Sequence, residues 1–170
     1  MTRWTISVRI LHWITVLVLL VQLVVVFGLQ GPGIAMLIWM PWHISLGFSL
    51  LILLFLRLAT RAVTSARNVG SGKVATAMQA LLYLVLMAAT LSGWFAFRSA
   101  ALMPTPLVFG LFRLRPVRLP FDAPWTALHQ AFVWLLIALV VAHAAAAAYH
   151  FLILKDRVLQ RMMFAWKRDR

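Results

Sequence analysis

The five histidines are the residues of this 170-residue chain whose type and spacing point to chemistry. All five fall inside long apolar stretches, where an ionisable side chain is costly and is by default a functional residue. The chain has no cysteine, which excludes disulfides, iron–sulfur clusters, thiolate-ligated haem and covalent C-x-x-C-H haem attachment. Its three Asp and Glu residues are too few for a paired-carboxylate hydrolase or a carboxylate metal cage.

The spacing of these histidines predicts two pairs at two depths of a membrane. His129 and His143 are fourteen residues apart on one helix, which returns them to within about 40° of one direction and separates them by about 21 Å along the axis. By depth, His43 matches His129 on the outer side and His12 matches His143 on the inner side. An iron held between two imidazoles carries electrons and leaves no position for oxygen. We therefore predict two haem b groups, each with one of these pairs as its axial ligands.

Two other interpretations of the same histidines stay open. A single His in a transmembrane helix can simply hydrogen-bond a carbonyl group of a neighbouring helix. A zinc or copper ion would need its ligands to converge at one depth, which these pairs do not do. Small residues favour haem, because Gly47 and the alanine run at 144–148 would let a flat macrocycle lie close to the backbone.

Four charge-free stretches, each long enough to span a bilayer, which takes about 20 apolar residues, must position the histidines. They span residues 10–28, 34–56, 74–97 and 125–154. Apolar residues make up 64% of the chain and charged residues 11%, and the mean hydropathy is +0.96, which a soluble domain of this size could not cover with polar surface. We predict an all-α membrane protein, one four-helix domain over residues 1–170, with an outer loop at 98–124 and a basic tail at 155–170.

The 16 Lys and Arg residues predict the orientation. All but four lie on the side of the two termini, so the positive-inside rule places both termini in the cytoplasm. The net charge of +13 is then explained by anionic lipid at the helix ends and by a tail that lies on the membrane as a basic interfacial helix, and nucleic acid is not expected as a partner.

The remaining four cations lie in the outer loop with a single acid, Asp122. They are Arg98, Arg113, Arg115 and Arg118. A cationic mouth over the outer haem would concentrate an anion such as superoxide and raise its rate of encounter. Alternatively, one or two of these arginines neutralise haem propionates while the others meet lipid headgroups.

Short motifs occur in order along nearly the whole chain. They are Leu11-His12-Trp13, the run from His43 to Gly47 with Arg57 after it, Leu82-Tyr83, Ser92-Gly93-Trp94, His129, His143 to Ala146, His150-Phe151 and the run from Lys155 to Met162. In this set the chain resembles the bacterial cytochrome b561 family of four-helix dihaem membrane proteins, which includes superoxide oxidase. The resemblance implies the same four histidines as haem ligands and a place in the bacterial inner membrane.

The resemblance also implies a function, namely electron transfer between the periplasmic face and the quinone pool, most specifically oxidation of superoxide coupled to reduction of ubiquinone. The quinone would bind at the cytoplasmic end. His150, two turns beyond His143 on the same face, is a candidate to bond a quinone oxygen or relay protons, and it could equally be an interfacial His or a propionate partner. Gln79 is a second candidate, or it bonds a neighbouring helix.

Two positions depart from the family pattern, both at the cytoplasmic end. Gln79 stands where many members carry a His, and Met163-Phe164 replaces the ending of a common Arg-Met-x-Pro tail. Two further functions stay open. The chain could be a non-enzymatic haem b subunit that anchors a larger redox complex and docks a periplasmic redox partner, or a haem-free scaffold or transporter.

Overall fold

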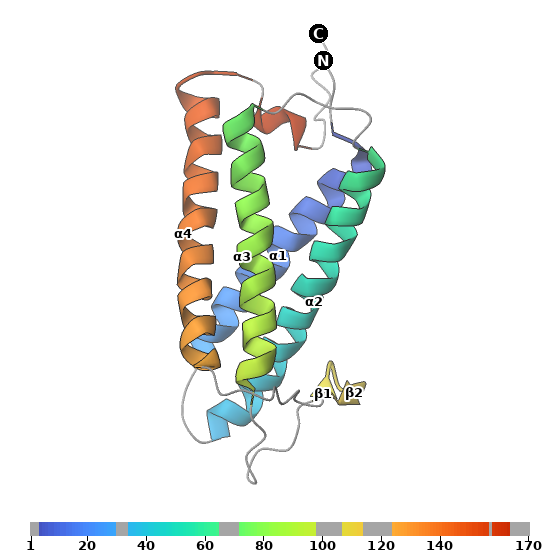
Figure 1. Ribbon diagram of the computed structural model, residues 1–170, viewed down its shortest axis with the longest axis vertical. Coiled ribbons are helices and arrows are strands. Elements are labelled where there is room, and N and C mark those ends of the chain that lie inside the picture. The colour runs from blue at the N-terminus through green and yellow to red at the C-terminus, as the bar shows by residue number, and fades with distance from the viewer. Residues whose placement is uncertain are drawn as a thin grey trace.

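A computed structural model describes residues 4–29, 34–64, 72–97, 107–113, 124–156 and 158–163. Within these residues, four long helices form the body of the molecule (Figure 1). They are α1 (Ile6–Leu29), α2 (Ile34–Thr64), α3 (Lys73–Ala96) and α4 (Trp125–Leu152). Each is long and apolar enough to cross a membrane. The prediction of an all-α membrane bundle of four transmembrane helices is therefore confirmed.

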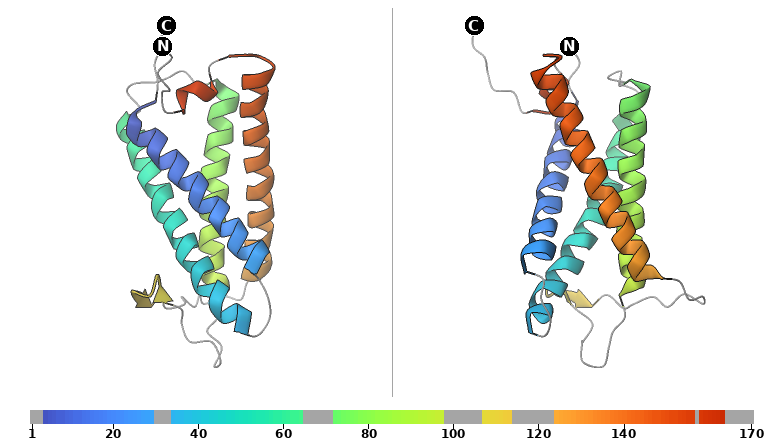
Figure 2. Two further views of the ribbon diagram at one scale, coloured as in Figure 1. Left: turned by 180° about the vertical axis from the view of Figure 1, so that it is seen from behind. Right: turned by 90° about the vertical axis from the view of Figure 1, so that its left-hand side faces the viewer.

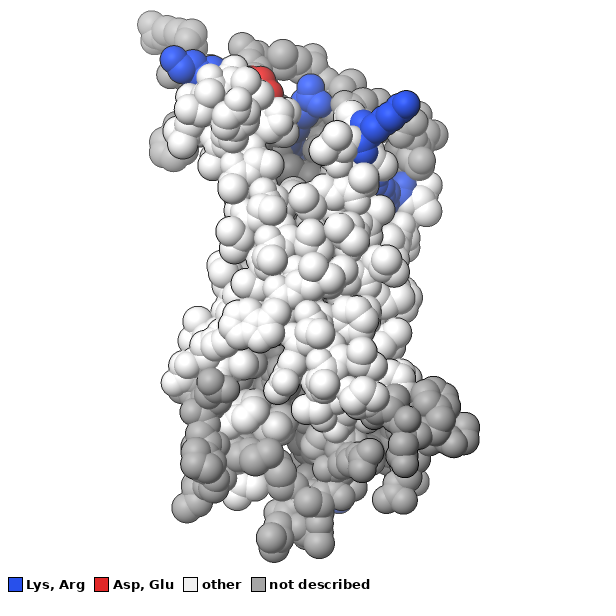
Figure 3. Space-filling view, turned by 60° about the vertical axis from the view of Figure 1, so that its left-hand side comes forward, with Lys and Arg blue, Asp and Glu red and all other residues white. Residues whose placement is uncertain are grey.

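The outer surface of the bundle is apolar. Leu17 on α1, Leu84 on α3 and Trp134 on α4 are all more than 60% exposed. Figure 3 shows a waist that carries no Lys or Arg on the face in view, and most of the blue atoms lie at one end. Because a helix satisfies its own backbone hydrogen bonds, such a surface is stable against lipid, where it needs no polar cover.

Three helix ends differ by two residues or more from the predicted ones. α1 begins at Ile6, four residues before the predicted residue 10. α2 continues to Thr64 instead of ending at residue 56, because Arg57 and Arg61 turn their guanidinium groups onto neighbouring helices. α4 ends at Leu152, two residues earlier than predicted. Arg57 and Arg61 therefore do not end α2, because each has a hydrogen-bond partner on a neighbouring helix.

The helices pack as two close pairs, α1 with α2 and α3 with α4, which meet where α2 contacts α3. The buried core lies in the middle of the bundle and comes from Leu50, Leu54, Val85, Leu86 and Leu136. No Cα atom of α4 comes within 8 Å of a Cα atom of α1 or α2 in the described residues. α4 therefore faces α1 and α2 across a space that side chains, and not backbone contacts, must bridge.

The outer loop contains a short β-hairpin. The loop was predicted from the sequence, but the hairpin was not. Strands β1 (Leu107–Val108) and β2 (Phe112–Arg113) pair antiparallel around a turn in which Phe109 and Gly110 both have positive φ, 48° and 73°. The hairpin lies beside α2 (Figure 1), and the Phe109 backbone N–H donates to Ser45 Oγ at 2.9 Å. Val108 is fully buried, so this part of the loop is anchored to the bundle.

The tail also differs from the predicted interfacial helix. Its described part forms a single 3-10 turn, η2 (Leu159–Arg161), at the end of the bundle where α1 begins (Figure 2). Arg9 Nη1 donates to the carbonyl of Met163, and Trp13 Nε1 donates to that of Met162, both at 3.0 Å. The tail is thus fastened across α1. We call this end of the bundle the inner end and the end with the hairpin the outer end.

Candidate functional site

His43 on α2 and His129 on α4 face each other in the outer half of the bundle. Their ring centroids are 6.0 Å apart and their planes are inclined by 77°. Trp39, one turn before His43 on α2, lies edge-on to it with 6.0 Å between the centroids. We call His43 and His129 the outer pair.

His12 on α1 and His143 on α4 face each other in the inner half. Their centroids are 6.4 Å apart, with 76° between the planes. Trp13 lies edge-on to His12, with 5.5 Å between the centroids. We call His12 and His143 the inner pair. The buried core of the bundle lies between the two pairs along its length.

Both pairs have the spacing that a shared metal ion requires. Two imidazole nitrogens on opposite sides of one ion, each bonded at about 2 Å, lie about 4 Å apart, and the half-ring behind each nitrogen brings the centroids to about 6 Å. Both pairs also join α4 to helices whose Cα atoms do not come within 8 Å of it in the described residues, so the histidine side chains, and not the backbones, meet at each level. The residues therefore fit a bis-histidine haem at each level. Within the described residues no group of three or more His, Cys, Asp or Glu side chains converges, as a zinc site would need.

His129 is held against α3. Its Nδ1–H donates to the carbonyl of Ala89 at 2.8 Å, which leaves Nε2 as the free nitrogen. A Cβ atom at Gly93 would lie 2.8 Å from His129 Cε1 and 3.0 Å from Nδ1, so any other residue at position 93 would displace the ring. One turn after His43, a Cβ atom at Gly47 would meet nothing within 4 Å. Open space thus lies beside one ligand candidate and close packing behind the other.

His43 is held by Gln22 of α1. Nδ1 of His43 lies 2.6 Å from the carboxamide nitrogen of Gln22, which is buried within the bundle. Each imidazole of the outer pair therefore has its Nδ1 atom occupied, one by a backbone carbonyl and one by a carboxamide. In both rings Nε2 is the nitrogen that these contacts leave unengaged.

The inner pair has a cation as its neighbour. Arg57 Nη2 donates to His12 Nδ1 at 3.2 Å, and its guanidinium lies over the ring of Tyr83, 5.3 Å from the centroid. A guanidinium can only donate, so His12 Nδ1 accepts in this arrangement and Nε2 carries the proton. Nε2 would bind a haem iron only after Arg57 releases Nδ1 and the ring proton moves there. The two pairs thus differ in what their Nδ1 atoms meet.

Comparison with known families settles the class of protein. The chain matches the family described as prokaryotic cytochrome b561 over residues 3–165. The chain belongs to this family. The resemblance seen in the sequence is thereby confirmed. A search among curated proteins finds no match.

Family membership gives this cytochrome its general role. It is a multi-pass protein of the bacterial inner membrane that binds haem b and transfers electrons. The number of haems, their ligands, the quinone and the superoxide reaction stay predictions. The four histidines are the strongest candidates as ligands, because they form two facing pairs with metal-bridging distances.

The two quinone candidates of the cytochrome both have partners within the chain. His150, in the last turn of α4, donates from Nδ1 to Asp156 Oδ2 at 2.5 Å, which leaves Nε2 free at a half-exposed position. The bond from the Val158 backbone N–H, and then that from His150, hold the pKa of Asp156 below its usual value, so this carboxylate stays ionised. The carboxamide oxygen of Gln79 accepts a hydrogen bond from Arg61 of α2. Such a bond to a neighbouring helix is the alternative to quinone binding that the sequence left open.

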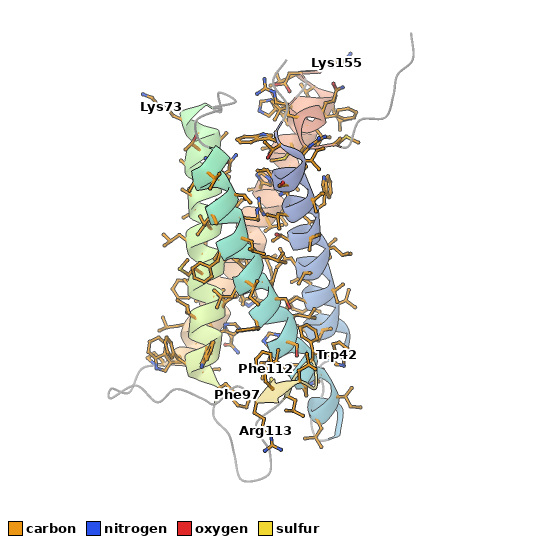
Figure 4. All side chains as sticks on the ribbon, turned by 90° about the vertical axis from the view of Figure 1, so that its right-hand side faces the viewer. Trp42, Lys73, Phe97, Phe112, Arg113 and Lys155 are labelled. Atoms are coloured by element: carbon orange, nitrogen blue, oxygen red, sulfur yellow. The ribbon has the colours of Figure 1, made fainter. Side chains whose placement is uncertain are left out.

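Of the four loop arginines, the structure describes Arg113. Its side chain lies beside the hairpin at the outer end, opposite Lys73 and Lys155 (Figure 4), and is exposed. Arg98, Arg115 and Arg118 lie outside the described residues.

Gln22 was not named as a site residue from the sequence, and the contact of Arg57 with a histidine was not predicted. Gln22 is a polar residue within the first apolar span, and a buried polar group in a membrane helix needs a partner. That signal was present in the sequence. It did not show which histidine the carboxamide meets, because the answer depends on how α1 packs along α2.

Proposed function

We propose that this cytochrome holds two haem b groups, one at each histidine pair, and passes electrons from the periplasmic face to ubiquinone at the inner end. The observation that carries the proposal is the presence of two facing histidine pairs at two depths, each with one member on α4. The described Lys and Arg residues, apart from Arg113, lie at the inner end, and we therefore place that end at the cytoplasmic side.

The electron donor we propose is superoxide. Each superoxide that loses one electron becomes O₂, and two electrons with two protons convert ubiquinone to ubiquinol. Haem iron supplies one-electron transfer, and with two imidazoles bound it offers oxygen no coordination position. The protein contributes the orientation of the four imidazoles, the apolar core between the pairs and the charge at each face.

At the outer face, the charge of the loop is the support for an anionic donor. Arg113 is exposed beside the hairpin, and Arg98, Arg115 and Arg118 belong to the same loop of the sequence. With Asp122 as the single acid of this loop, its net charge is positive. A positive surface raises the local concentration of an anion and its rate of encounter.

At the inner face, His150 and Gln79 are the proposed contacts of the quinone. His150 has its Nδ1 bound to an ionised Asp156, so Nε2 can bond a quinone oxygen and pass on a proton. Gln79 has its carboxamide oxygen bound to Arg61, so its NH₂ group remains as a donor. Both groups lie on residues close to the ends of their helices, where protons from the cytoplasm can arrive.

The test is anaerobic purification in detergent, a haem count, and stopped-flow mixing with superoxide in the presence of a soluble ubiquinone analogue. We expect two haem b per chain with low-spin spectra, reduction of both by superoxide, O₂ release, and reoxidation by the quinone. Superoxide dismutase added beforehand should abolish the reduction. A haem-loaded protein that superoxide does not reduce, but that a co-purifying partner does, would favour the electron-transfer subunit instead. A colourless protein would contain no haem and would favour the haem-free scaffold or transporter.

A further inference from the structure

Gln22 has an unmatched oxygen in the interior of the bundle. Its carboxamide nitrogen lies 2.6 Å from His43 Nδ1 and 3.2 Å from the His43 carbonyl oxygen, while its Oε1 is buried without a hydrogen-bond partner. An unsatisfied buried polar atom destabilises the folded protein, because it has given up its hydrogen bonds to water. The arrangement therefore leaves one atom of the carboxamide unfavourably placed.

A half-turn of the carboxamide exchanges its nitrogen and oxygen, and hydrogen-bond partners decide which atom faces His43. With the oxygen toward the imidazole, Oε1 accepts from Nδ1–H, and a separation of 2.6 Å suits that bond better than contact between two nitrogens. The half-turn gives up the longer bond to the His43 carbonyl oxygen, which already accepts an N–H group within α2. The NH₂ group of Gln22 then takes the position without a partner, so the short separation of 2.6 Å, and not the number of matched atoms, favours this orientation.

The tautomer of His43 depends on this choice. If the carboxamide donates, Nδ1 is the acceptor and Nε2 carries the proton, which blocks Nε2 as a metal ligand. If the carboxamide accepts, the proton sits on Nδ1 and Nε2 is free. His129 has the second arrangement, since its Nδ1–H donates to the Ala89 carbonyl.

We propose that Gln22 is a positioning residue of the outer pair: its Oε1 accepts the Nδ1 proton of His43, holds Nε2 toward His129, and lowers the reduction potential of the outer haem. The inference rests on the proposed haem at this pair. A hydrogen-bond acceptor behind a ligating imidazole fixes the ring and makes the ligand more basic, which favours the oxidised metal. Gln22 thereby reaches the iron only through His43.

The experiment is a redox titration of purified holoprotein, resolved for the two haems, in Gln22→Leu, Gln22→Glu and a control variant. Gln22→Leu should raise the potential of the outer haem and leave that of the inner one unchanged. Gln22→Glu keeps an oxygen acceptor and should bring the potential back to the original value or below it. The control is Thr15→Val, which removes another buried polar group of α1 whose hydroxyl bonds only the Leu11 carbonyl in the structure.

A second measurement keeps the proposal testable if Gln22→Leu loses haem. In the reduced, diamagnetic protein labelled with ¹⁵N-histidine, the Nδ1 proton of His43 should give a slowly exchanging resonance that Gln22→Leu shifts or removes. The corresponding proton of His129 is an internal reference, because it bonds the backbone. Loss of the outer haem in Gln22→Leu that Gln22→Glu restores also supports the proposal.

An unchanged potential of the outer haem in Gln22→Leu, with both haems bound, would overturn the proposal for Gln22. An equal shift in Thr15→Val would also overturn it. Loss of haem in both Gln22 variants would do the same. Such results differ from failure of the proposed function itself. That failure would appear in the unmodified protein, as the absence of a low-spin haem at the outer pair.

Discussion

The outer and inner pairs share a ligand type and a spacing, but their neighbours have opposite electrical character. Behind the outer pair lie oxygen atoms, the Ala89 carbonyl at His129 and, in our proposal, the Gln22 carboxamide at His43. Beside the inner pair lies the Arg57 cation. Acceptors favour oxidised iron and a nearby positive charge favours reduced iron. Electrons should therefore move downhill from the outer pair to the inner pair, toward the quinone.

The largest expected effect separates the two pairs from each other. His12→Ala should remove mainly the inner haem, and His43→Ala mainly the outer one, because each substitution deletes one of the two axial ligands that we propose for that haem. Haem content by pyridine haemochrome and low-temperature spectra of the α-band measure both. Loss of the outer haem from His12→Ala, or a single haem in the unmodified protein, would break the pairing.

Gly93→Ala should damage the outer pair alone. The new methyl group would lie within 3 Å of the His129 ring, and over-packing of this kind costs about 1–3 kcal/mol. We expect weaker retention of the outer haem during titration with apomyoglobin. Gly72→Ala is the matched control, because a Cβ atom there meets nothing within 4 Å. Equal retention in the two variants would show that His129 can move freely.

The two depths of the histidine pairs and the four helices could be predicted from the sequence, because the helix has a fixed periodicity. The fourteen-residue interval of His129 and His143 on one apolar span determines two depths on one face, and the apolar stretches determine the four helices. Both hold without knowledge of the packing.

The rest depended on contacts between helices. That Gln22 meets His43, and that Arg57 meets His12 across 45 residues, follows from how α1 packs along α2. The end of α2 was predicted too early for the same reason, since Arg61 finds a partner on α3. The hairpin needs the fixed turn at Phe109 and a pocket for Val108, which no periodic pattern indicates.

Arg57→Leu should reduce the difference in reduction potential between the inner and the outer haem. Removing the cation should lower the potential of the inner haem and leave the outer one unchanged, so that transfer between them becomes less favourable. An interaction of about 1.4 kcal/mol corresponds to about 59 mV for one electron. Arg57→Lys keeps a positive charge and should lower the potential less. Redox titration measures the shift, and an upward shift of the inner potential would contradict the electrostatic account.

His150→Ala should slow quinone-coupled turnover and keep both haems, since His150 lies two turns beyond His143 and its contact is with Asp156. Asp156→Asn tests the orientation of the ring separately. The lowered pKa of Asp156 keeps the carboxylate ionised, and its support of His150 is lost only as pH falls through that lowered value. Asp156→Asn should therefore slow quinone reduction at neutral pH and weaken its acid dependence. Quinone kinetics that neither variant changes would make His150 an interfacial residue.

The smallest expected effect concerns the outer face, where the proposed donor arrives by long-range attraction. If Arg98, Arg113, Arg115 and Arg118 steer superoxide, its rate of haem reduction should fall as ionic strength rises, because exposed charges are screened beyond about 8 Å at physiological salt. Neutralising Arg113 with one of the others should lower that rate and flatten its salt dependence, while reduction by a neutral donor stays the same. An Arg bound to a propionate would instead change haem potential or occupancy. A rate that responds to neither salt nor these substitutions would remove the electrostatic reason for an anionic donor, and the outer pair would then be better explained as a docking point for a protein.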